Sequence, residues 1–123
     1  MAEPVVIAVI DDDASLRGAL VALVRSRGYE ARGFESAEDF LNGSRDAVGC
    51  IVTDIQMPGM SGIELKRHLV AEGRDVPTIM ITARAEKGLE ERARASGALG
   101  FLKKPLEPNR LAECIERALR TGA

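Results

Sequence analysis

The sequence predicts an α/β fold: a single doubly wound parallel sheet of five strands in the order 2-1-3-4-5, with five helices. Short runs rich in Val and Ile alternate with segments of helical periodicity, and parallel neighbours in a sheet need such crossover helices. The chain of 123 residues has the size of one domain. Because 46% of it is apolar but only 3% aromatic, Val, Ile, Leu and Ala must build the core, as in sheets covered on both faces.

The first strand is predicted over Val5–Ile10, a continuous apolar run that an acidic triplet ends. Asp13, the last residue of the triplet, can cap a helix that runs to about Gly28. The apolar residues expected to share one face of this helix are Leu16, Leu20, Leu23 and Val24. The weakly alternating stretch Tyr29–Phe34 predicts a short edge strand, and Ser36 opens a short helix that ends in an Asn-Gly-Ser sequence.

The third strand is predicted in the apolar run that begins at Cys50 and carries Asp54 near its carboxyl end, before a sharp Pro-Gly turn. In open α/β sheets ligands bind at that end of the strands, so Asp54 is the leading candidate for a functional residue. Ser61 then begins a capping box, which starts a helix that runs to about Glu72.

The last part of the chain is expected to hold two more strands and two more helices. The strands are predicted over Val76–Thr82 and Ala98–Leu102. The helix between them, Glu86–Ser96, is mostly charged, and we expect it to be the loosest of the five. Pro108 is well placed in the first turn of the final helix. The residues expected to face inward on this helix are Leu111, Ile115, Ala118 and Leu119.

Composition limits the partners and the compartment. A net charge of -2 gives no electrostatic case for nucleic acid or an anionic membrane as the main partner. The longest apolar run is far shorter than the ~18 residues of a membrane span, and we expect no signal peptide, so the sequence predicts a cytoplasmic protein. Cys50 and Cys114 show no metal-ligand spacing. Free thiols are favoured over a disulfide, which fits a reducing compartment.

Carboxylates gather at the predicted switch point of the sheet, between the first and third strands. Asp11 and Asp12 follow the first strand, and Asp54 ends the third. Neighbouring carboxylates repel one another and lose hydration, so the arrangement makes physical sense around a hard cation such as Mg²⁺. An acidic triplet by itself is also typical of a helix cap with solvated neighbours. The position of Asp54 at the adjacent strand end favours the metal site.

Two other strand ends add a hydroxyl and a cation. Thr82 ends the fourth strand, and Lys104 follows the fifth. Taken singly, Thr82 is typical of a cap and Lys104 of a solvated charge. Beside carboxylates, the hydroxyl can donate to an anion, and the ammonium can pair with Asp54 or with a phosphoryl group. The set predicts a phosphoryl-transfer site in which a carboxylate attacks while metal and lysine neutralise the transferring oxygens.

The Asp11-Asp12 pair, the T-D-I-Q-M-P-G-M-S-G sequence, Thr82 and the Lys104-Pro105 pair together resemble the receiver domain of two-component response regulators. The resemblance covers essentially the whole chain, residues 1–123, and implies a flavodoxin-like receiver fold. The sequences F-E-S-A-E-D-F-L, M-P-G-M-S-G-I-E-L and P-T-I-M-I-T are similar to the FixJ-type branch of this family.

By this resemblance Asp54 is the phosphorylated aspartate. Asp12 and Asp54 are implied to bind Mg²⁺ directly, Asp11 to act through water, and Gln56 to lend its backbone carbonyl to the metal. Gln56 and Arg84 are implied to stand at the mouth of the site. There, the Gln56 amide can orient a water, and the Arg84 guanidinium can shield the phosphoryl oxygens.

The resemblance also implies which residues hold the phosphoryl group, which residues form the switch, and which proteins are the partners. Thr82 and Lys104 hold the phosphoryl oxygens, the Lys104-Pro105 peptide is cis, and Phe101 with Thr82 forms the switch. A sensor histidine kinase or phosphotransfer protein supplies the phosphoryl group, and a homodimer forms on phosphorylation. The protein is no enzyme in the usual sense, because it catalyses only its own phosphorylation and dephosphorylation. Since the chain ends directly after the last predicted helix, we expect no DNA-binding domain and no nucleic acid contact by this chain.

A phosphatase of haloacid-dehalogenase type is the alternative, because Asp11-x-Asp13 imitates its opening motif. Against it, Ser15 stands where that family has Thr or Val, no second acidic metal motif follows the Lys, and a cap does not fit in this length. A flavin-binding domain would need a phosphate loop where this chain has three negative charges. His68, the only histidine, is predicted to be a solvated helix residue and not a phosphodonor.

Overall fold

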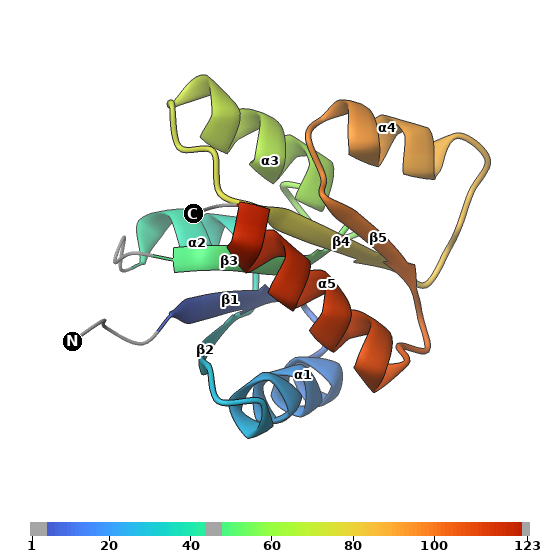
Figure 1. Ribbon diagram of the computed structural model, residues 1–123. Helices are drawn as coiled ribbons and strands as arrows, with labels where there is room; N and C mark the ends of the chain where they lie inside the picture. The colour runs from blue at the N-terminus through green and yellow to red at the C-terminus, as the bar shows by residue number, and fades with distance from the viewer. Residues whose placement is uncertain (1–4, 44–47, 122–123) are drawn as a thin grey trace.

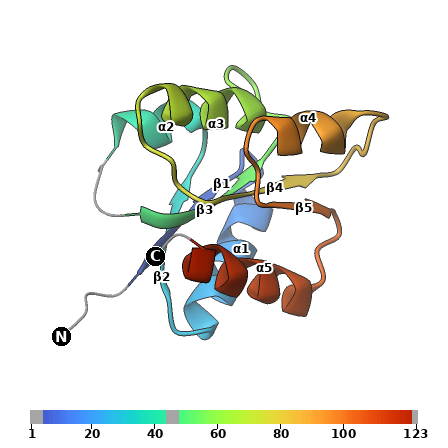
Figure 2. The ribbon, with the colours of Figure 1, turned by 45° about the horizontal axis from the view of Figure 1, so that its top comes forward.

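The computed structural model describes residues 5–43 and 48–121. In chain order its elements are β1 (Val6–Ile10), α1 (Ala14–Ser26), β2 (Glu30–Phe34), α2 (Ala37–Asn42), β3 (Val48–Asp54), α3 (Gly62–Ala71), β4 (Thr78–Thr82), α4 (Leu89–Ala95), β5 (Gly100–Lys103) and α5 (Pro108–Thr121). The strands form one parallel sheet in the order β2-β1-β3-β4-β5, as predicted. Helices α1 and α5 lie on one face of the sheet, and α2, α3 and α4 lie on the other (Figures 1 and 2).

Alternation along the strands divides the core between the two faces of the sheet. Ile7 and Val9 of β1 belong to the apolar cluster that includes residues of α1 and α5. Ala8 and Ile10, the residues between and after them, belong to the cluster that includes residues of α2 and α3. Every residue of β1 and of β4 is buried, as expected for parallel strands with helices on both sides.

The predicted caps fix the starts of α1 and α3. The side chain of Asp13 accepts hydrogen bonds from the backbone N–H groups of Ser15 and Leu16, at 3.0 and 3.1 Å. At α3 the capping box is complete. The Glu64 N–H donates to Ser61 Oγ at 3.1 Å, and the Ser61 N–H donates to Glu64 Oε1 at 3.0 Å. These caps fix the chain just beyond the ends of β1 and β3, where the acidic residues lie.

The predicted limits of α4 and β5 are wrong, each for a local reason. α4 begins after Gly88 and not at Glu86, because Gly88 has a φ of 80° and no side chain of the described residues caps the helix. β5 begins at Gly100 and not at Ala98. The N–H of Ala98 donates instead to the carbonyl of Ala93 at 3.1 Å, which closes the end of α4.

Two further strand limits also differ from the prediction. β4 begins at Thr78 and not at Val76, because the Val76 carbonyl accepts a hydrogen bond from Lys66 Nζ at 2.7 Å. Pro77, which lies between Val76 and Thr78, has no N–H to contribute to a strand ladder. β3 begins earlier than predicted, at Val48, and continues through a glycine that the sequence pattern places at the strand boundary.

Three minor expectations can be compared with the structure. Cys50 and Cys114 are both free thiols, and burial raises the pKa of Cys50 to about 12. His68 is exposed on α3, with its Nε2 3.5 Å from Glu72 Oε2. Over residues 5–43 and 48–121, we find no helix with the length and apolar character needed to cross a lipid bilayer.

Candidate functional site

The acidic residues meet at the carboxyl ends of β1 and β3, which are neighbours in the sheet. One carboxylate oxygen from each of Asp11, Asp12 and Asp54 lies within 4.8 Å of the other two. Asp11 and Asp54 are buried, at 0% and 5% exposure, whereas Asp12 is exposed. The structure therefore brings together the three carboxylates that the sequence places at the switch point.

Within the described part of the chain two buried oxygens of this cluster accept no hydrogen bond: Asp54 Oδ1, and Asp11 Oδ2, whose contact is an ion pair with Lys104 Nζ at 3.3 Å. Asp54 Oδ1 has neither a hydrogen bond nor an ion pair among the described residues, so its burial is costly unless a further cation is bound there. Asp11 Oδ1 accepts the N–H of Asp13 at 2.9 Å, so the turn before α1 orients this carboxylate. A set of carboxylate oxygens, one of them buried without a partner among the described residues, fits a hard divalent cation such as Mg²⁺ better than a soft metal.

Lys104 brings a positive charge to the cluster. Its Nζ lies 3.1 Å from Asp54 Oδ2 and 3.3 Å from Asp11 Oδ2. The N–H of Lys104 donates to the carbonyl of Thr82 at 2.8 Å, which holds the end of β5 beside the end of β4. The Lys104-Pro105 peptide is cis, as the family resemblance implies. The ammonium thus reaches the carboxylates of β1 and β3 from the edge strand of the sheet.

Burial and the interaction between Asp54 and Lys104 act in opposite directions on the pKa of each of these two residues. Burial raises the pKa of Asp54, and the charge of Asp11 adds to the increase, although the hydrogen bond and charge of Lys104 oppose it. Burial acts to lower the pKa of Lys104, but the hydrogen bond to Asp54 and the charges of Asp54 and Asp11 outweigh burial and raise it. Lys104 is therefore protonated, and ionised Asp54 retains an energetic penalty that a cation would relieve.

The chain beyond Asp54 turns back so closely that it requires glycine. A Cβ atom on Gly62 would lie 2.5 Å from the Asp54 carbonyl oxygen, so only glycine lets α3 begin against the end of β3. The same loop is held from α2, where Glu38 accepts the N–H of Met60 at 3.0 Å. Sequence reasoning missed Glu38, because no local pattern connects this helix residue with a loop far along the chain.

Thr82 is fully buried at the end of β4, and its hydroxyl lies 2.7 Å from Gln56 Oε1. The same hydroxyl lies 2.9 Å from the carbonyl of Arg84 and accepts the N–H of Arg84 at 3.0 Å. Gln56 Nε2 is 3.4 Å from that carbonyl. The family resemblance implied that Gln56 and Arg84 stand at the mouth of the site, but it gave no sign that the Gln56 side chain contacts Thr82.

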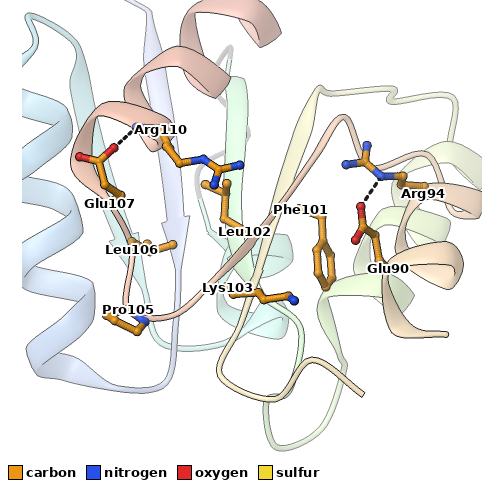
Figure 3. A pocket seen from close by; sticks show the side chains of 9 residues that line it. All are labelled: Glu90, Arg94, Phe101, Leu102, Lys103, Pro105, Leu106, Glu107 and Arg110. Atoms are coloured by element: carbon orange, nitrogen blue, oxygen red, sulfur yellow. Dashed lines mark hydrogen bonds and ion pairs between the residues drawn. The ribbon is translucent and has the colours of Figure 1, made fainter. Parts of the chain in front are cut away.

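Phe101 lies on β5, half-buried against the apolar cluster that joins α4 to the sheet. Figure 3 shows its ring in a pocket of about 370 Å³, near the pair in which Arg94 Nε is 3.0 Å from Glu90 Oε2. None of Asp11, Asp12 and Asp54 lines this pocket. It belongs to the outer face formed by α4, β5 and the start of α5.

A second hollow, of about 670 Å³, opens at Asp54 itself. The loops after β3 and β4 border it, and its lining includes Gln56, Arg84 and, from α4, Arg92. A small molecule can therefore approach Asp54 from this side.

Comparison with known proteins agrees with the geometry. The family described as the response regulator receiver domain matches residues 7–116. The transcriptional regulatory protein FixJ of Bradyrhizobium diazoefficiens is 39% identical over 113 residues, which are 91% of this chain and 55% of that protein. The response regulator protein TodT of Pseudomonas putida is 38% identical over 116 residues, 94% of this chain and 51% of TodT. The chain thus spans about half the length of these relatives.

Solved structures give the same result. The crystal structure of FixJ-N is 33% identical with a TM-score of 0.88, covering 97% of this chain and 96% of that one. The response regulator StyR is 40% identical with a TM-score of 0.90, covering 98% of this chain and 61% of StyR. These matches confirm the resemblance to the FixJ-type branch and give no support to a phosphatase. The chain belongs to the receiver domains of response regulators, which act in phosphorylation-dependent signalling.

Proposed function

We propose that Asp54 is the phosphoacceptor of this domain and takes a phosphoryl group from a partner histidine kinase or phosphotransfer protein in an Mg²⁺-dependent reaction. A carboxylate oxygen of Asp54 forms the new O–P bond, while the N–P bond of phosphohistidine breaks and its electron pair stays on the imidazole nitrogen. The acyl phosphate is later hydrolysed at the same site. The protein in this way modifies only itself.

The observation that carries this proposal is the environment of Asp54. One of its oxygens is paired with Lys104, and the other is buried without a hydrogen-bond donor in the described part of the chain. Asp11 and Asp12 stand beside it. A carboxylate so placed meets a cation, a metal-binding cluster and an open approach from solvent, which are the requirements of phosphoryl transfer to an acid group.

We assign Mg²⁺ to the cluster of carboxylates. Asp12 and Asp54 are direct ligands, Asp11 acts through water, and the backbone carbonyl of Gln56 is the remaining ligand from the protein. When bound, the ion neutralises negative charge on the transferring phosphoryl oxygens. The support is the donor set, three carboxylates of which one, Asp54, has a buried oxygen with no hydrogen bond or ion pair among the described residues.

We assign the remaining site residues to the phosphoryl group and to the switch. The Lys104 ammonium, which rests on Asp54 and Asp11, pairs with a phosphoryl oxygen, and Thr82 donates its hydroxyl to another. Inward movement of Thr82 leaves space that Phe101 fills, because Phe101 is half-buried on the neighbouring strand. The face formed by α4, β5 and α5 then changes shape.

We infer that this face is read by proteins and that phosphorylation favours a homodimer through it. A net charge of -2 argues against nucleic acid as a ligand of this chain itself. The two free thiols fit a cytoplasmic location. Size-exclusion chromatography with light scattering, with and without beryllofluoride and Mg²⁺, tests the dimer. A mass that stays monomeric in both conditions contradicts it.

Intact-mass spectrometry with acetyl phosphate as donor tests the proposed function. The wild type should gain one phosphoryl group when Mg²⁺ is present and none in EDTA. Asp54→Asn should gain none. The matched control is Asp75→Asn, which changes an exposed carboxylate outside the cluster and should be labelled like the wild type. Labelling of Asp54→Asn to the wild-type extent overturns the assignment of the phosphoacceptor.

A further inference from the structure

The side chain of Gln56 bridges the two loops that border the Asp54 hollow. Its Oε1 lies 2.7 Å from the hydroxyl of Thr82, and its Nε2 lies 3.4 Å from the carbonyl of Arg84. Both ends of one amide group therefore engage the segment at and just after the end of β4. This double contact orients the amide with its oxygen toward Thr82.

The hydroxyl of Thr82 has a single proton to donate. Two acceptors lie within reach, Gln56 Oε1 at 2.7 Å and the Arg84 carbonyl at 2.9 Å. Gln56 Oε1 is the nearer of the two, and the Arg84 carbonyl already faces the Gln56 Nε2 donor. A hydroxyl that donates to Gln56 cannot at the same time donate to a phosphoryl oxygen on Asp54.

We propose that Gln56 is a positioning residue that withholds the Thr82 hydroxyl until Asp54 is phosphorylated, so that the amide and the phosphoryl group compete for one proton. The inference rests on the proposed role of Asp54 as phosphoacceptor. The phosphoryl oxygen wins because it is charged, and charge-assisted hydrogen bonds are about twice as strong as neutral ones. Until then, the competition lowers the affinity of the resting site for the phosphoryl group and the fraction of molecules that switch spontaneously.

The Gln56–Thr82 bond can be tested without any phosphodonor, because Gln56 is the only glutamine in the chain. Glutamine labelled with ¹³C therefore gives a single side-chain carbonyl resonance. A carbonyl that accepts a hydrogen bond resonates downfield, so Thr82→Val, which keeps the shape but removes the hydroxyl, should move this signal upfield. The matched control Thr82→Ser keeps the hydroxyl and should leave the signal near its wild-type position. An unchanged resonance in Thr82→Val overturns the proposal.

The competition is tested by titrating beryllofluoride, a phosphoryl mimic, at fixed Mg²⁺. Gln56→Met keeps a similar length but cannot accept this proton, and it should bind the mimic roughly two- to tenfold more tightly, the factor that corresponds to one neutral hydrogen bond. In a Thr82→Val background the same substitution should give no such gain. An equal gain in both backgrounds means that Gln56 acts elsewhere, and it overturns the proposal.

The two experiments separate failure of this inference from failure of the proposed function. If the wild type binds no beryllofluoride, Asp54 is not the phosphoacceptor that we propose, yet the glutamine resonance still decides whether Gln56 holds Thr82. If the wild type binds the mimic, its Gln56 resonance should move upfield on saturation, as it does in Thr82→Val. A resonance that stays in place shows that the hydroxyl never leaves Gln56 and contradicts the competition.

Discussion

The proposed reaction requires an ionised carboxylate at Asp54, whereas burial in the fold disfavours the ionised form. Burial raises the pKa of this carboxyl, and the neighbouring Asp11 adds to the penalty for its ionised form. In EDTA at pH 7, Asp54→Asn should therefore melt higher than the wild type, by roughly 2–5 °C. Calorimetry measures this, and added Mg²⁺ should raise the melting temperature of the wild type more than that of the variant, which lacks one of the proposed ligands. A variant that melts lower in EDTA contradicts this account of the site.

We predict that Arg84 controls how long the proposed acyl phosphate survives. It is exposed and lines the hollow that opens at Asp54. Because its side chain is long and always charged, it can lie across the phosphoryl oxygens and hinder an attacking water. Arg84→Ala should then lose the phosphoryl group several-fold faster, on the order of 1 kcal/mol in the barrier.

The decay of the phosphorylated protein, followed by the release of inorganic phosphate, measures this effect of Arg84. Arg92 is a suitable matched control, since it lines the same hollow from α4. Arg92→Ala should change the lifetime little. A decay in Arg84→Ala that is equal to that of the wild type, or slower, removes Arg84 from the mechanism.

Among the elements, α4 is held less firmly than α3. α3 begins with a capping box and has five buried residues. α4 receives no side-chain cap from the described residues and has only two buried residues, Leu89 and Ala93. Amide protons in α4 should exchange roughly tenfold faster than those in α3. Hydrogen exchange followed by NMR tests this, and beryllofluoride should shift the amide resonances of α4 more than those of α3. Better protection in α4 would be inconsistent with the proposal that the face containing α4 changes shape on phosphorylation.

Lys66 ties α3 to the loop before β4 with a buried ammonium group. The residue is 2% exposed, and its Nζ lies 2.8 Å from Asp75 Oδ1 and 2.7 Å from the Val76 carbonyl. The hydrogen bond and charge of Lys66 lower the pKa of Asp75. Since this pKa is lower in the fold, the stabilisation is present above the unfolded value of ~3.9 and is lost as the pH falls through the folded value.

Asp75→Asn should therefore melt lower than the wild type at pH 7, and the difference should shrink as the pH falls below ~3.9. Thermal unfolding followed by circular dichroism at a series of pH values checks this. A difference that stays constant across the series would show that the charge of Asp75 plays no part.

For the whole molecule, the strand order and most elements could be predicted, because each strand and helix carries its own hydrophobic pattern. The caps at Asp13 and Ser61 were predicted from equally local patterns, and the structure confirms both. The predicted start of β4 was wrong because Lys66, from another element, takes the carbonyl of Val76. Boundaries that depend on such tertiary contacts have no signature in the local sequence.

One part of the candidate site could likewise be predicted from the sequence, and another part could not. The carboxylate cluster could be predicted, because Asp11, Asp12 and Asp54 follow strands that the topology makes neighbours. The contact of Gln56 with Thr82 could not, since it joins two loops and depends on side-chain rotamers. The location of the cluster thus follows from the pattern of the chain, whereas the hydrogen bonding of Thr82 follows only from the packed structure.

The central claim is that Asp54 carries the phosphoryl group, and chemical trapping tests it most directly. Borohydride reduces an aspartyl phosphate to homoserine, which peptide mass spectrometry then locates in the chain. After treatment with acetyl phosphate and Mg²⁺, the account predicts homoserine at position 54 and unmodified aspartate at positions 11 and 12. Homoserine at either of those positions, or an absence of homoserine in a sample whose intact mass has increased, would contradict it.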